Sequence, residues 1–129
     1  MRKDSANLIQ SALYDLDTAV HMLTTGRYLY VVFMCHLSIE KMLKAVAAEA
    51  AGKTPPRTHN LLYLTKLAGV GFSENHFEFI SKINNASVVT RYPEDFSALA
   101  ASFPEEVVAA YLEKTREIVA WLRQNEKLS

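Results

Sequence analysis

Apolar residues recur at helical spacing along most of the chain. Between Asp4 and Thr25 they follow each other at steps of three and four, which is the spacing of one apolar stripe on a helix. The segment from Tyr28 to about Ala51 is apolar on nearly all sides and contains no glycine or proline. A helix of this kind is usually covered by neighbours over most of its circumference, so we expect it at the middle of a helical bundle.

Glycine and proline residues mark where these helices end. Gly26 and Gly52 follow the first two helices at the position where a helix commonly stops. Two consecutive prolines predict a loop over 53–59, because proline lacks the backbone donor and pushes the residue before it toward extended geometry. The leucines after this loop predict a short helix that ends at Gly69-Val70-Gly71.

Two more helices are expected in the second half of the chain. Ser73 can cap the first of them, which must end before Tyr92-Pro93. The stretch from Arg91 to Ser102 is interpreted as a second long loop. The sequence Ser102-Phe103-Pro104-Glu105 then has the spacing of a capping box and predicts the start of the last helix, which should fray around Asn125.

No segment alternates between apolar and polar residues as a strand does, and no internal repeat is present. The chain has 129 residues, of which 50% are hydrophobic, and this is enough for one buried core but not for two domains. We therefore expect a single all-α domain over residues 1–129, an antiparallel up-and-down four-helix bundle with an additional short helix. Three of its helices should be long and two shorter.

The charges balance overall but not locally. The chain has 14 Lys and Arg against 14 Asp and Glu, so as a whole it lacks the attraction for nucleic acid or membrane surfaces that a basic protein has. Residues 36–66 carry five basic and two acidic side chains, a net charge of +3, whereas residues 67–129 carry six basic and nine acidic ones, a net charge of −3. Any contact with a nucleotide or RNA must therefore be local.

Cysteine usage and hydropathy indicate a protein of the cytoplasm. Cys35 is the only cysteine, so the chain can form no internal disulfide. The N-terminus runs into polar and acidic residues instead of the apolar core of a signal peptide. The longest apolar run, Tyr28–Cys35, is followed by His36 and Glu40 and falls short of the ~20 residues that cross a bilayer. We expect a soluble, cytoplasmic chain without membrane contact.

The main candidate site lies on the second helix. His36, Glu40 and Lys44 are four residues apart and form one polar line on an otherwise apolar helix. In one interpretation Glu40 and Lys44 are an ordinary surface ion pair and His36 is a packed, hydrogen-bonded residue. In the other, the three side chains face a cleft, because buried polar groups without partners are costly.

Two predicted loops carry further candidates. Arg57 and His59 lie just before the short helix, where a histidine and backbone N–H groups can bind an anion, and an ordinary solvated loop is the alternative. Arg91 and Tyr92 offer a guanidinium and a phenol beside a rigid turn. Arg91 can equally pair with a carboxylate of the same segment at the surface.

Other kinds of site find little support in the residue types. The chain has no His-Glu-x-x-His motif and no two histidines four residues apart on one helix, so we expect no metal site. Cys35 lies in the apolar run and is better explained as a small buried hydrophobe than as a nucleophile. The few glycines fall at helix ends, so we expect no glycine-rich phosphate loop and no bound cofactor.

The order and spacing of several segments resemble the HEPN family, whose name refers to nucleotide binding in higher eukaryotes and prokaryotes. The resemblance covers nearly the whole chain. It rests on Gly26-Arg27-Tyr28 ahead of the long apolar helix, His36-Leu37-Ser38-Ile39-Glu40-Lys41-Met42-Leu43-Lys44-Ala45, Pro55-Pro56-Arg57-Thr58-His59-Asn60-Leu61 and Arg91-Tyr92-Pro93.

The resemblance implies a small prokaryotic helical bundle, often a homodimer, that commonly works with a minimal nucleotidyltransferase in a toxin–antitoxin pair. It assigns family positions to six polar side chains: Glu40, Lys41, Lys44, His59, Arg91 and Tyr92. If these converge, Lys44, Arg57 and Arg91 can hold phosphate. Tyr92 can then stack on a base, and Glu40 can orient a lysine or accept a sugar hydroxyl.

Many HEPN proteins are metal-independent ribonucleases with an arginine and a histidine a few residues apart. That motif is absent, because Arg27 and His36 are too far apart, Arg57 and His59 are too close, and no histidine follows Arg91. We therefore favour a non-catalytic subunit that binds a nucleotide or a protein partner. One alternative is an RNA-cleaving toxin with His59 or His36 as the acid–base group and Arg57 or Arg91 as the charge stabiliser, in which His59 and Arg91 are the catalytic candidates. Another is a helical dimerisation module without a small-molecule site.

Overall fold

The structure is a computed structural model that describes residues 1–129, and its regular elements are all helical. This confirms the all-α expectation. The chain forms six α-helices and one 3-10 helix: α1 (Lys3–Thr24), α2 (Tyr28–Ala51), α3 (Leu61–Ala68), α4 (Glu74–Arg91), α5 (Phe96–Ser102), α6 (Glu105–Arg123) and η1 (Glu126–Leu128). None of these helices is apolar over enough of its length to span a membrane.

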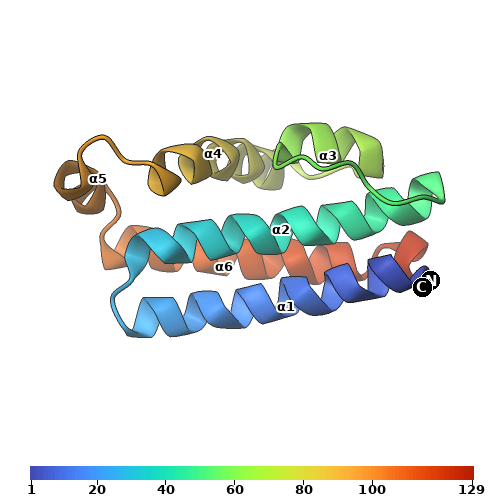
Figure 1. Ribbon diagram of the computed structural model, residues 1–129, viewed down its shortest axis with the longest axis horizontal. Coiled ribbons are helices and arrows are strands. Elements are labelled where there is room, and N and C mark those ends of the chain that lie inside the picture. The colour runs from blue at the N-terminus through green and yellow to red at the C-terminus, as the bar shows by residue number, and fades with distance from the viewer.

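The helices form an elongated bundle with α2 at its centre. Helices α1, α2 and α6 run along the length of the molecule, and α3 and α4 lie along the side of α2 that faces away from α1 (Figure 1). The two helices α3 and α4 together take the place of a fourth long helix. Both chain termini lie at one end of the bundle and α5 lies at the other.

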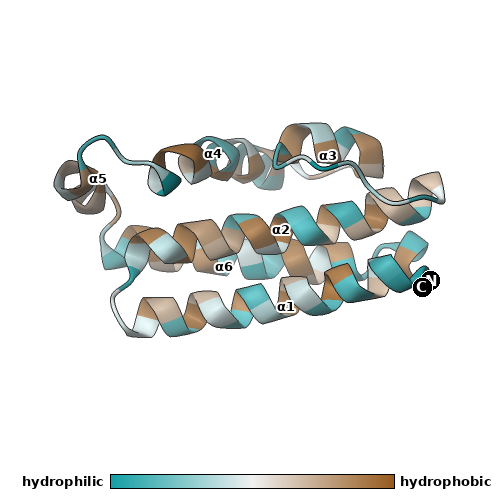
Figure 2. Cartoon of the chain, in the orientation of Figure 1, coloured by the Kyte–Doolittle hydropathy of each residue, from teal (hydrophilic) through white to brown (hydrophobic).

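Helix α2 is central because almost its whole circumference is apolar. It contacts α1, α3, α4 and α6, and more than half of its 24 residues are buried. Ile39, Met42 and Leu43 are among the largest fully buried side chains, and burying each of them contributes about 1.5–3 kcal/mol to folding. Hydrophobic residues colour much of α2, with hydrophilic turns near its middle (Figure 2).

The predicted helix ends are confirmed for the first four helices. Gly52 follows α2 with a φ of 68°, a left-handed conformation that glycine adopts without steric cost. The Asn60 side chain caps α3, and the Ser73 hydroxyl accepts a hydrogen bond at the start of α4. Helix α4 ends at Arg91, directly before Tyr92-Pro93.

The expected loop from Arg91 to Ser102 is wrong, because most of it forms α5. The Asp95 carboxylate accepts a hydrogen bond from the Ala98 backbone N–H at 3.1 Å and so caps this helix. The residues that follow include three alanines and a leucine, which favour helix. No residue of α5 is buried, so the sequence carries no apolar stripe that would have indicated it.

The predicted capping box at Ser102 is also wrong. Ser102 is the last residue of α5, and its hydroxyl donates back to the Ala98 carbonyl at 3.3 Å. Helix α6 starts at Glu105 after Pro104, and no side chain caps it. Since α4 has 18 residues, the chain has four long helices and two short ones instead of the predicted three and two.

Candidate functional site

A buried carboxylate connects α2 with the loop before α3. Glu40 lies on α2 and is 3% exposed. Its Oε2 accepts a hydrogen bond from Lys44 Nζ at 3.1 Å, and its Oε1 lies 2.9 Å from Nδ1 of His59. An ionised carboxylate can only accept, so with Glu40 ionised the proton of this second bond is on Nδ1, and Nε2 of His59 takes no part in it. The His59 side chain is 65% exposed, so that nitrogen is available to a ligand.

His36 lies one turn before Glu40 and is almost completely buried. Its Nδ1 is 3.6 Å from Glu40 Oε1, and neither ring nitrogen has a hydrogen-bond partner. Burial lowers the pKa of His36 to about 4, the Glu40 carboxylate opposes this shift, and the positive charge of Arg91 adds to it. His36 is therefore neutral near pH 7.

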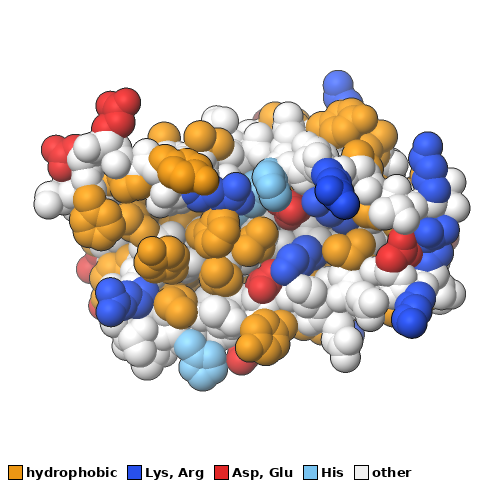
Figure 3. Space-filling model, in the orientation of Figure 1, with side chains coloured by type: hydrophobic (Ala, Val, Ile, Leu, Met, Phe, Trp, Pro, Cys, Tyr) orange, Lys and Arg blue, Asp and Glu red, His pale blue; other side chains and the backbone are white.

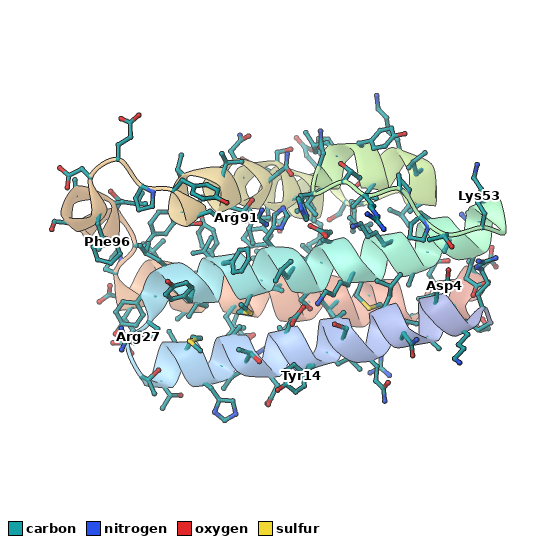
Figure 4. All side chains as sticks on the ribbon, viewed as in Figure 1. Asp4, Tyr14, Arg27, Lys53, Arg91 and Phe96 are labelled. Atoms are coloured by element: carbon teal, nitrogen blue, oxygen red, sulfur yellow. The ribbon has the colours of Figure 1, made fainter.

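Arg91 brings a guanidinium to the face of α2. It is the last residue of α4, and its guanidinium carbon lies 4.6 Å from the centre of the Phe33 ring. In Figure 4 its side chain lies between α4 and α2. The Nε of Arg91 is buried and has no hydrogen-bond partner. Stacking on Phe33 fixes the plane of the guanidinium and leaves its N–H groups to a ligand.

A pocket of about 620 Å³ opens beside Arg91. It lies where the turn between α1 and α2 meets the end of α4 and the start of α5. Its wall has five aromatic rings, two guanidinium groups and no carboxylate, a combination that suits a ligand with both an aromatic ring and negative charge. The lining residues are Gly26, Arg27, Tyr28, Leu29, Tyr30, Phe33, Thr90, Arg91, Tyr92, Pro93, Phe96 and Ala100.

The surface around this pocket combines apolar and basic character. On the face shown in Figure 3, hydrophobic side chains cover the N-terminal half of α2, and Lys, Arg and His side chains gather between α2 and the row formed by α3 and α4. Tyr30 and Tyr92 are among the exposed aromatic residues of the pocket wall.

The structure gathers most of the candidate residues, in two adjoining groups. The first, called here the Glu40 cluster, consists of His36, Glu40, Lys44 and His59. The second consists of Arg91 and Tyr92 in the pocket wall. The interpretation of Glu40 and Lys44 as an ordinary solvated pair does not fit, because Glu40 is buried and has a further partner in His59.

Two candidate residues lie outside these groups. Lys41 turns toward α1, where its Nζ lies 2.6 Å from Asp15 Oδ2 and donates to Ser11 Oγ at 2.7 Å. It therefore joins two helices of the core. Arg57 is exposed in the loop before α3, away from the pocket wall.

Sequence reasoning missed several residues of the pocket. Arg27 and Tyr28 follow directly after a glycine at the start of α2, and this local signal could have identified them. Phe33 and Phe96 carried no such signal, because only the packing of α4 and α5 on the end of α2 brings them together with Arg91.

The geometry gives no support to metal or thiol chemistry. No group of three or more His, Cys, Asp or Glu side chains could hold a metal ion. Cys35 is buried, and burial raises the pKa of its thiol to about 12, so it is not a thiolate near neutral pH.

Comparisons with known proteins agree on the family and the fold. A family model described as the HEPN domain matches residues 5–125. The structure is similar to TT1696 from Thermus thermophilus, with a TM-score of 0.79 and 23% identity over 98% of this chain and 100% of that one. It is also similar to ST0689, an archaeal HEPN homologue, with a TM-score of 0.74 and 18% identity over 95% of this chain and 97% of that one. No curated protein sequence matches the chain significantly.

Proposed function

This chain belongs to the HEPN domain family, and we propose that it is a non-catalytic subunit that binds a nucleotide in the pocket beside Arg91. The observation that carries the proposal is the pocket that Arg91 lines, which has a second guanidinium, five aromatic rings and no carboxylate. Guanidinium groups without a carboxylate partner attract an anionic ligand, and the aromatic rings beside them offer a stacking surface for a base.

The size and chemistry of the pocket support a nucleotide. Its volume of about 620 Å³ lies within the range typical of small-molecule sites, roughly 300–1,000 Å³. Arg27 and Arg91 can each donate two hydrogen bonds to a phosphate. Tyr92 is 83% exposed and can stack on a base, a contact that tolerates any base because each one has a π face.

The Glu40 cluster supplies a second group of donors. Arg91 stacks on Phe33 and His59 lies 2.9 Å from Glu40, and these two contacts fall within two turns of α2. When its ring is protonated, His59 can donate from Nε2 to a further phosphate oxygen, while Nδ1 donates to Glu40, which holds the ring in one orientation. In this proposal Glu40 is a positioning residue, and Arg91 and His59 contact the ligand.

Titration calorimetry with the purified full chain tests the proposal. ATP, AMP, adenosine and inorganic phosphate serve as ligands, because the last two separate the base contact from the phosphate contact. Arg91→Met should weaken ATP binding about tenfold to a hundredfold, which corresponds to the ~1.5–3 kcal/mol of a hydrogen bond to a charged group. Arg116→Met is the matched control, since Arg116 is an arginine of α6 whose Nε lies 3.8 Å from Glu113, outside the pocket wall.

The outcomes separate the proposal from its alternatives. Arg116→Met should bind ATP within about twofold of the wild type. If none of the four ligands binds to the wild type, the nucleotide proposal is overturned. If Arg91→Met and Arg116→Met weaken ATP binding equally, the contact is general charge attraction and not a site.

We also propose that the chain forms a homodimer and works with a minimal nucleotidyltransferase. The exposed apolar side chains over the N-terminal half of α2, including Tyr30, support a second copy on that face. The transferase rests on the family resemblance alone. Sedimentation equilibrium should give twice the chain mass for the wild type and the single mass for Tyr30→Glu. Co-expression with a minimal nucleotidyltransferase should give a complex that survives size exclusion.

One observation favours metal-independent RNA cleavage as a second candidate function. The Glu40–His59 hydrogen bond of 2.9 Å orients an exposed imidazole as a buried carboxylate orients a general base. The purified protein should then cleave RNA in EDTA, and both His59→Ala and Arg91→Ala should abolish cleavage. Cleavage that persists in both variants would identify a contaminating nuclease.

A further inference from the structure

Helix α5 forms the end of the bundle, and Leu99 is its one hydrophobic side chain that packs against the core. None of its seven residues is buried. A helix this short is not stable in water by itself, so it depends on contacts that cover its apolar side chains. Beside it, Val88 and Val89 at the end of α4 are 66% and 49% exposed, and Phe96 at the start of α5 is 64% exposed.

The two valines border a groove of about 510 Å³ between the end of α4 and α5, called here the α5 groove. Its wall includes Val88, Val89, Leu99, Glu94 and Asp95, and it contains no basic residue. The groove is therefore lined by apolar and acidic side chains.

The acidic character extends beyond the groove. From residue 92 to residue 113 the chain has five carboxylates and no lysine or arginine. Acidic side chains project at the α5 end of the molecule in Figure 3. This segment contributes most of the negative charge that residues 67–129 carry.

We propose that the α5 groove docks a cationic amphipathic segment of another protein, with an apolar stripe on the valines and lysine or arginine side chains on the carboxylates. Laying the apolar face of a helix into a hydrophobic groove is a common mode of peptide recognition. Complementary charge selects the partner and speeds the encounter. The proposal goes beyond nucleotide binding and does not depend on it.

A second copy of this chain fits the groove less well. In a two-fold dimer the same patch of both copies meets itself. Such an arrangement would enclose Glu94 and Asp95 of both copies in one interface to which the groove contributes no basic residue, and this excess of like charge opposes association. A partner of opposite charge avoids this repulsion.

The groove shares a wall with the nucleotide pocket. Tyr92 and Pro93 line both. A docked segment would therefore touch the turn that carries Tyr92 and can alter the shape of the pocket from the opposite side.

Two synthetic helical peptides of about 18 residues test the proposal by fluorescence anisotropy. Both carry the same leucine stripe, and their polar faces consist of lysine in one and glutamate in the other. The wild-type full chain should bind the lysine peptide at least tenfold more tightly than the glutamate peptide. Equal binding of the two peptides, or no binding of the lysine peptide, would overturn the proposal.

Matched variants locate the binding. Glu94→Lys and Val89→Ser should each weaken binding of the lysine peptide about fivefold, through the lost charge pair and the lost apolar contact. Glu126→Lys makes the same charge change at the opposite end of the bundle and should alter binding less than twofold. Circular dichroism checks that the helical content of each variant is unchanged.

Two results would overturn the assignment of this surface. If Glu126→Lys weakens binding as much as Glu94→Lys, the peptide responds to net charge and not to the groove. If sedimentation shows that Val89→Ser dissociates a wild-type dimer, the groove is the contact between two copies of the chain.

Discussion

Replacing His36 by leucine should remove a large part of the acid sensitivity of this fold. His36 is buried and neither ring nitrogen has a partner within hydrogen-bond geometry, so leucine gives up only the longer contacts of the ring with Glu40 and with the backbone of His59. The two side chains have similar volumes, and we expect the free energy of unfolding at pH 7 to change by less than about 1.5 kcal/mol.

The size of the pH effect follows from the pKa of His36. In the unfolded chain an ordinary histidine has a pKa of 6.5, and burial lowers this pKa to about 4 in the folded chain. Between these values the unfolded chain binds the proton and the folded chain does not, so wild-type stability is fully present above pH 6.5 and falls as the pH drops toward 4. One pKa unit corresponds to about 1.4 kcal/mol, which gives a loss of about 2 kcal/mol between pH 7 and pH 4.5.

Urea unfolding of the wild type and His36→Leu at pH 7 and pH 4.5 measures this effect. Carboxylates elsewhere lower the stability of both proteins in acid, so the relevant quantity is the change in the difference between them. From pH 7 to pH 4.5, the free energy of unfolding of His36→Leu should rise by about 2 kcal/mol relative to that of the wild type. The matched control is His21→Leu, because His21 is exposed on α1 and should show no such change. A difference between wild type and His36→Leu that stays constant with pH would refute the buried neutral imidazole.

Three further predictions concern the fold. Gly52→Ala should lower the free energy of unfolding by about 1–2 kcal/mol and lower Tm, because Gly52 has a φ of 68° that alanine adopts only with strain. Gly71 has no positive φ, so Gly71→Ala is the control and should change Tm little. Equal shifts in Tm for the two variants would contradict this reasoning. Lys41→Met should lower the free energy of unfolding measured in urea by about 3–5 kcal/mol, because it leaves the buried carboxylate of Asp15 unpaired. The affinity of the folded protein for ATP should not change. Asp95→Ala should reduce the helical circular dichroism signal, because it removes the cap of α5 and the helix unfolds. Ser102→Ala should leave the signal unchanged, because Ser102 caps no helix. A loss of signal in Ser102→Ala alone would show that Ser102 caps α6 after all.

Local signals in the sequence identified each helix that packs on the core with a buried face, although they misplaced the cap of α6. The apolar circumference of α2, the glycine after it and the serine before α4 each have one physical explanation, and the structure has these features as predicted. Helix α5 was not predicted, because hydrophobic periodicity indicates only those helices that bury one face, and no residue of α5 is buried. Asp95 was the available signal, but an aspartate before a short alanine-rich run also fits a loop.

The candidate site could also be predicted only in part from local signals. Spacing of four residues on a helix establishes that His36, Glu40 and Lys44 share a face, but not what covers that face. The cover is the loop before α3, which is fixed where Asn84 Oδ1 of α4 accepts a hydrogen bond from the Leu61 backbone N–H at 2.9 Å. This anchor lies two residues after His59 and holds that imidazole over Glu40.

The Glu40 cluster therefore depends on the packing of α3 and α4 as much as on α2. Lys44 and Glu40 would meet on an isolated α2, but His59 reaches Glu40 only when the loop is held between α2 and α4. Asn84→Ala removes that anchor without touching any residue of the cluster or the pocket wall. ATP binding should weaken in this variant even though Arg91 is intact, and circular dichroism should show an unchanged helix content. Unchanged ATP affinity would mean that the contacts at Arg91 are sufficient and that His59 takes no part in binding.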